Sequence, residues 1–126
     1  MGNAGILSAY RQNTVQGASP VGLVVALYDT VIRDFRRAAD ALDRGDVESR
    51  VNELNHALTV IAHLKSVLDH QRGGEAASRF DNFYEVARAM ILSANVNASR
   101  EILSRLVEMF SSMRAAWHKA ELGISK

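Results

Sequence analysis

The segment Gly17-Ala18-Ser19-Pro20-Val21-Gly22-Leu23-Val24-Val25-Ala26-Leu27-Tyr28-Asp29 decides the fold class of this chain. Ser19 carries a hydroxyl that can cap the free amides at the start of a helix, and Pro20 suits the first helical position because its missing N–H would have no partner there. The residues after Pro20 are apolar on every side for almost two turns. A surface helix of a small protein normally shows water a polar face, so we expect something to cover the outer face of this helix.

Three further segments show apolar residues in alternating steps of three and four, which predicts an all-α protein with four helices. The first two stripes are Val24, Tyr28, Val31, Phe35, Ala38 and Leu42, and then Val51, Leu54, Leu58, Ile61 and Leu68. The last two are Phe80, Tyr84, Ala87, Ile91 and Ala94, and then Leu103, Leu106, Phe110, Met113, Trp117 and Ala120. We expect Trp117 to belong to the core rather than to a contact surface.

Glycine, asparagine and capping residues indicate where these helices begin and end. In chain order, the expected boundaries are Pro20 and Gly45 for the first helix, Asp46 and Gly73-Gly74 for the second, Glu75 and Asn95-Val96-Asn97 for the third, and Gly123 for the end of the fourth. The joints between them are short, so the helices should form an antiparallel up-down-up-down bundle over residues 19–123. A tail follows at residues 124–126.

Residues 1–18 are expected to form a detachable N-terminal arm. Ile6, Leu7 and Tyr10 make a short apolar patch, and Gly17 supplies a hinge before the first helix. The patch is large enough to dock on the bundle but too short to form a stable helix alone.

The composition narrows the class of protein. A chain of 126 residues fits one domain, and 15 Lys and Arg against 14 Asp and Glu leave no strong field that would recruit nucleic acid or anionic lipid. There is no Cys, no basic leader followed by an apolar core, and no apolar run long enough to span a bilayer. We therefore expect a cytoplasmic protein that neither binds nucleic acid nor inserts into a membrane.

The sequence does not predict a metal or cofactor site. Glu53-Leu54-Asn55-His56 matches half of the Glu-x-x-His signature of di-iron bundles, but no second copy exists. The spacing of seven between His56, His63 and His70 separates neighbours by about 10 Å along a helix, which is too far for one ion. We expect these histidines to face water and the protein to use no cofactor.

Catalysis is not predicted either, because no Ser lies in a nucleophile elbow and Gly73-Gly74 lacks the continuation of a phosphate-binding loop. Arg33, Arg36, Arg37 and Arg44 alternate with Asp34, Asp40 and Asp43, a pattern that is typical of a solvated helix face.

An excess of apolar residues remains on the first two helices. Leu23, Val25 and Leu27 lie beside the first stripe, and Ala57, Val60, Leu64 and Val67 lie beside the second. Either these helices are interior and touch several neighbours, or they border a groove that awaits a partner. The N-terminal arm is a candidate cover for such a groove.

The residues resemble the FliS family of flagellar secretion chaperones over nearly the whole chain. The landmarks are Tyr10, Val15, Ala18-Ser19-Pro20, Leu23 and Leu27-Tyr28-Asp29, followed by Ala57, Ile61, Leu64, Leu68, Gly73-Gly74-Glu75, Phe83-Tyr84, Ala94-Asn95 and Trp117. Gly17, Ala26, Thr30 and Phe83 depart from the family pattern. The resemblance implies a non-enzymatic cytoplasmic chaperone that binds the disordered C-terminal segment of flagellin, prevents its premature polymerisation and helps deliver it to the flagellar export apparatus.

The resemblance and the apolar patches together mark a set of candidate client-binding residues: Ile6, Leu7, Tyr10, Val15, Ser19, Pro20, Leu23, Leu27, Tyr28, Leu64 and Asn95. Two other classes stay open. One is a cofactor- or metal-binding bundle, and the other is a structural bundle that buries its apolar excess against a second copy of itself as a homodimer.

Overall fold

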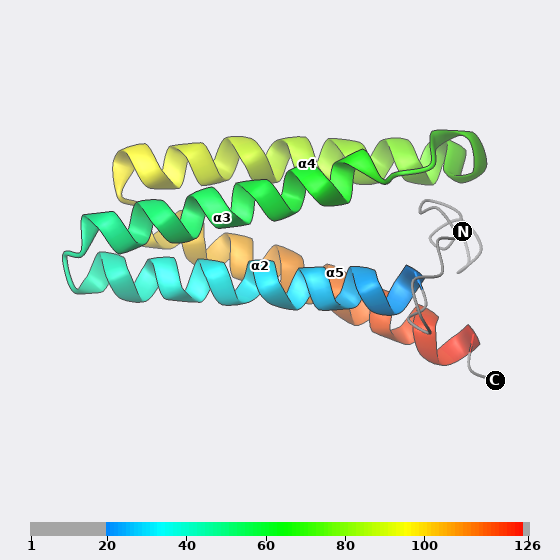
Figure 1. Ribbon diagram of the computed structural model, residues 1–126, viewed down its shortest axis with the longest axis horizontal. Helices are drawn as coiled ribbons and strands as arrows, with labels where there is room; N and C mark the ends of the chain where they lie inside the picture. The colour runs from blue at the N-terminus through cyan, green and yellow to red at the C-terminus, as the bar shows by residue number, and fades with distance from the viewer. Residues whose placement is uncertain (1–19, 125–126) are drawn as a thin grey trace.

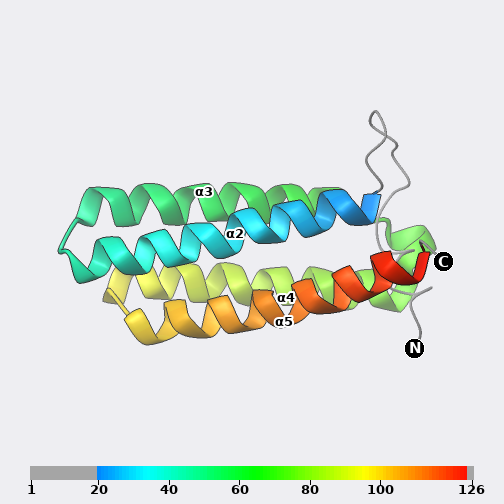
Figure 2. The same cartoon turned by 90° about the horizontal axis from the view of Figure 1, so that it is seen from below.

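The computed structural model describes residues 20–124, with side chains described for residues 21–120. It contains four helices: α2 (Pro20–Asp43), α3 (Val47–Ser66), α4 (His70–Asn97) and α5 (Arg100–Ile124). Each helix runs antiparallel to the next, and α2 and α4 each pack against both α3 and α5 (Figure 1). The view turned by 90° shows the same elongated bundle (Figure 2). The predicted all-α, up-down-up-down architecture is confirmed.

The joint between α2 and α3 has the predicted form. Gly45 adopts φ +71°, a left-handed conformation that glycine takes without a steric penalty. The Asp46 carboxylate then accepts the backbone N–H of Ser49 at 3.1 Å and caps α3. That backbone hydrogen bond also lowers the pKa of Asp46.

The predicted joint between the second and third helices is right about the break at Gly74 and wrong about the end of the second helix, which lies earlier and is followed by an extra helical turn. α3 ends at Ser66, and Asp69 caps α4 through the backbone N–H of Arg72. Gly74, expected to lie in the turn, instead forms a kink inside α4 with φ +49°. Asp69, whose side chain satisfies a free amide, begins the helix earlier than the glycine pair suggested, and Gly74 then bends it.

Two other predicted helix ends are also displaced. Residues 95–97 continue α4, and the helix is ended by Ala98 in the left-handed conformation. Gly123 lies inside α5, which continues to Ile124. Asparagine and glycine weaken a helix by only about 1 kcal/mol or less, so a packed helix continues through them.

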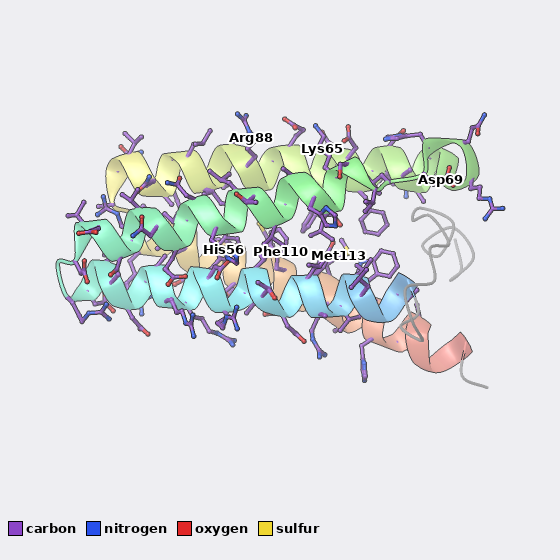
Figure 3. The ribbon with its side chains drawn as sticks, viewed as in Figure 1. His56, Lys65, Asp69, Arg88, Phe110 and Met113 are labelled. Atoms are coloured by element: carbon purple, nitrogen blue, oxygen red, sulfur yellow. The ribbon has the colours of Figure 1, made fainter. Side chains whose placement is uncertain are left out.

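The predicted stripes build the core. Most of their members are buried, whereas Leu42, Val51, Leu58 and Met113 are half-buried. All four helices contribute fully buried large side chains: Tyr28, Phe35, Leu54, Leu64, Tyr84, Ile91, Leu103, Leu106, Phe110 and Trp117. Figure 3 shows Phe110 and Met113 among the side chains between the helices. The prediction that Trp117 is a core residue is confirmed.

Candidate functional site

The candidate client-binding residues divide into three groups. Five of them, Ile6, Leu7, Tyr10, Val15 and Ser19, lie outside the described residues. Pro20 begins α2. The others are Leu23, Leu27 and Tyr28 on α2, Leu64 on α3 and Asn95 on α4.

Leu23 and Leu27 lie on the face of α2 that borders α3. This face is identified by Asp34, which contacts His56 of α3 and follows Leu27 by seven residues, about two helical turns. Because the two helices are antiparallel and Asp34 lies opposite His56, Leu27 lies at the level of His63 and Leu64, and Leu23 lies at the level of Val67. Leu23 is 44% exposed, and Leu27 and Val67 are half-buried against the core. We call the region where α2 borders α3, made up of Leu23, Leu27, Asp34, His56, Leu64 and Val67, the α2/α3 seam; Asp34 and Leu64 are buried beneath its surface.

The apolar excess predicted on α3 is mostly interior. Ala57, Val60 and Leu64 are buried, and Leu64 is fully so. Val67 is only partly covered. The open apolar part of the seam is therefore confined to the end where α2 begins and α3 ends.

Tyr28 belongs to the centre of the bundle. Its hydroxyl shares a hydrogen bond of 2.7 Å with the hydroxyl of Tyr84 on α4, across the bundle. Burial raises the pKa of the Tyr28 phenol well above its usual range, more than the bond to Tyr84 lowers it. The ring of Tyr28 also packs against Phe110, with centroids 5.4 Å apart. The Tyr28 side chain packs in the core beneath the seam and does not form part of the seam surface.

Asn95 connects α4 to the start of α3. Its side-chain oxygen accepts a hydrogen bond from Arg50 Nε at 3.3 Å, and its backbone carbonyl accepts one from Arg50 Nη2 at 3.4 Å. This contact lies at the end of the bundle opposite to Leu23 (Figure 1). The structure therefore does not bring Asn95 together with the seam.

Asp34 and His56 form a contact that the sequence analysis missed. The Asp34 side chain was expected in a solvated face, yet it is buried, and His56 was expected to be simply solvated, yet its Nδ1 lies 2.6 Å from Asp34 Oδ2. His63 and His70 are exposed as predicted. The available signal was the spacing, since Asp34 follows Leu27 by seven residues and precedes Ala38 by four, which places it beside the apolar stripe.

Polar hollows lie beside the C-terminal half of α2. One, of about 160 Å³, is lined by Arg37, Asp40, Arg44, Ser49 and Glu53 and continues the seam beyond His56. Another, of about 430 Å³, lies between α2 and α5 and is lined by Arg36, Ala39, Asp40, Arg100, Leu103, Ser104, Val107 and Glu108. The seam is therefore apolar at the end near Leu23, and beyond His56 it is followed by the charged side chains of the smaller hollow.

The described residues contain no cluster of three or more His, Cys, Asp or Glu side chains that could hold a metal ion. Within the same part of the chain, no helix has the length and apolar character needed to cross a membrane. The Asp34 and His56 pair resembles the acid and base of a catalytic triad, but no described hydroxyl is hydrogen-bonded to the ring. The seam therefore combines an apolar surface near Leu23 with a polar surface beyond His56.

Comparison with known proteins agrees with the resemblance seen in the sequence. The family model for "Flagellar protein FliS" matches residues 3–123. The flagellar secretion chaperone FliS of Salmonella typhimurium is 30% identical over 116 residues, which cover 88% of this chain and 86% of that protein.

Two further relatives match over a similar length. The flagellar secretion chaperone FliS of Campylobacter jejuni is 26% identical over 112 residues, covering 89% of this chain and 88% of that protein. That of Bacillus subtilis is 27% identical over 113 residues, covering 90% and 84%. The chain therefore belongs to the family of the flagellar protein FliS, and these relatives are flagellar secretion chaperones.

Proposed function

We propose that this protein is an export chaperone that binds the disordered C-terminal segment of flagellin, prevents its premature polymerisation and helps deliver it to the flagellar type III export apparatus. Membership of the FliS family supports the chaperone class. A chaperone that holds a subunit before export acts where export begins, so we place it in the bacterial cytoplasm. The role needs no catalysis and no cofactor.

The observation that carries this proposal is the open apolar end of the α2/α3 seam. Leu23 is 44% exposed beside the half-buried Leu27 and Val67, on a rigid two-helix support. A disordered segment that folds on binding needs a preformed apolar surface of this kind, because part of its interaction energy is lost in ordering the segment.

We further propose that the N-terminal arm covers this seam while the chaperone is empty. Ile6, Leu7 and Tyr10 would then compete with the client, and cover of this kind would keep the apolar end of α2 from water. Amide hydrogen exchange around Leu23 should become faster when residues 1–10 are deleted. Unchanged exchange at Leu23 after the deletion would count against a covering role for the arm.

Binding of a flagellin C-terminal peptide should be driven by apolar burial and should depend only weakly on salt. The chain carries a net charge of +1, so steering by a large field is not expected. Calorimetry should show a clearly negative heat-capacity change, and affinity should change less than about threefold between 50 and 200 mM salt. A steep loss of affinity over that range would contradict an apolar contact.

A structural bundle that associates with its own copies is the competing function. Light scattering with and without the peptide separates the two. A one-to-one complex with the peptide supports the chaperone, whereas a dimer whose mass is unaffected by the peptide supports the structural bundle.

A further inference from the structure

Asp34 is an exception in the core of this bundle. Its side chain is 1% exposed and is the one buried charged side chain among residues 21–120. Removing a carboxylate from water is costly, and an apolar pair of similar volume at such a position is often equally or more stable. Stability alone therefore gives no reason for an acid here.

The buried carboxylate orients the His56 ring. An ionised carboxylate can only accept a hydrogen bond, so His56 Nδ1, 2.6 Å from Asp34 Oδ2, carries the proton and donates it. Nε2 lies on the other side of the ring, and no described residue bonds to it. The His56 side chain is 53% exposed, and Figure 3 places it where α3 borders α2. The result is a fixed ring that presents one nitrogen at the surface of the seam.

His56 also lies where the chemistry of the seam changes. Toward Leu23 and Val67 the seam is apolar, and beyond His56 it opens into the polar hollow that includes Arg37 and Glu53. A segment bound along the apolar half would therefore reach the His56 ring about 10 Å beyond the level of Leu27, a distance of two helical turns.

We propose that His56, positioned by Asp34, is a polar anchor that sets the register of the bound client. This inference rests on the proposed function. The client it fits carries an apolar stretch for the Leu23 end, followed by a hydroxyl or amide side chain that hydrogen-bonds Nε2. A hydroxyl or amide can both donate and accept, so it satisfies the ring nitrogen in either protonation state.

The decisive variant is Asp34→Leu/His56→Phe, which replaces the polar pair by apolar groups and avoids leaving an acid buried alone. It makes the seam more apolar while removing the anchor. We expect this variant to melt at or above the wild-type temperature and to bind a flagellin C-terminal peptide about tenfold more weakly by calorimetry, because one hydrogen bond is lost. A purely apolar seam would bind the peptide equally or more tightly, and that result would overturn the anchor.

His118→Phe is the control, since His118 is an exposed histidine on α5, which packs against α2 and α4 and does not border the α2/α3 seam. The affinity of this variant for the peptide should stay within about twofold of wild type.

Asp34→Asn tests the positioning role, because it keeps an acceptor for His56 Nδ1 but removes the charge. This variant should weaken peptide binding less than the double variant does.

The client side of the contact can be tested with a peptide series in which each Ser, Thr, Asn and Gln is replaced by Ala. One replacement should weaken binding to wild type about tenfold and leave binding to the double variant unchanged. If every replacement has the same effect on both proteins, the anchor is overturned while the chaperone function stands. If the wild-type protein does not bind the peptide at all, the proposed function fails first.

Discussion

Trp117→Ala should lower the free energy of unfolding by about 3 to 5 kcal/mol, the range for emptying a large buried aromatic site. The Trp117 side chain is fully buried, and its ring lies 5.2 Å from that of Phe80 between the centroids. Its removal leaves a cavity where α4 meets α5 near the end of the bundle that carries the seam. Urea denaturation measures the loss, and the melting temperature should fall by roughly 10 to 20 °C.

Lys119→Ala provides the control for this change, because Lys119 is exposed on the same helix. It should alter stability by less than about 0.5 kcal/mol. Should Trp117→Ala instead melt like wild type and lose the flagellin peptide, Trp117 would be a contact residue and its assignment to the core would be wrong.

Leu23→Asp should weaken binding of the flagellin C-terminal peptide by roughly 10- to 100-fold. Covering a leucine with an apolar partner contributes about 1.5 to 3 kcal/mol, and an aspartate at the same place would have to lose its water on binding. Each tenfold change in affinity corresponds to about 1.4 kcal/mol. Calorimetry measures the change, and thermal melting confirms that the variant is folded, as expected for a side chain that is 44% exposed.

Leu92→Asp is a closely matched control. Leu92 is 42% exposed but lies on α4, away from the α2/α3 seam. It should bind the peptide as wild type does. Equal losses for both variants would show that the seam has no special role, and no loss for either would place the client elsewhere on the bundle.

Periodicity predicted the architecture because each stripe is a property of one helix. Apolar residues at steps of three and four define a face that must be buried, and short joints leave antiparallel packing as the solution. Residues such as Phe35, Tyr84 and Leu106 are fully buried for this reason. Gly45 and Asp46 were equally predictable, since the conformation of a glycine turn and the hydrogen bond of a cap are local.

The other helix ends were not predictable, because several local signals compete and packing selects among them. Asp69 begins α4 although Gly73 and Gly74 follow within its first turns. Asn95, expected to break the helix, is held in it by its two contacts with Arg50 of α3. The energy differences between such alternatives are within about 1 kcal/mol, so one tertiary contact is enough to decide them.

The sequence by itself determined that this chain forms four amphipathic helices, that Trp117 is buried, and that α2 and α3 carry apolar residues beside their core stripes. Only the tertiary structure decided which part of that surface stays open, because exposure depends on the neighbouring helix and not on the stripe. It buried Val60 and Leu64, left Leu23 partly exposed, and paired Asp34 with His56 across the seam. The two residues are 22 positions apart and lie on different helices. Whether they meet depends on how α2 and α3 are rotated and shifted against each other, and the apolar pattern of a single helix does not specify that.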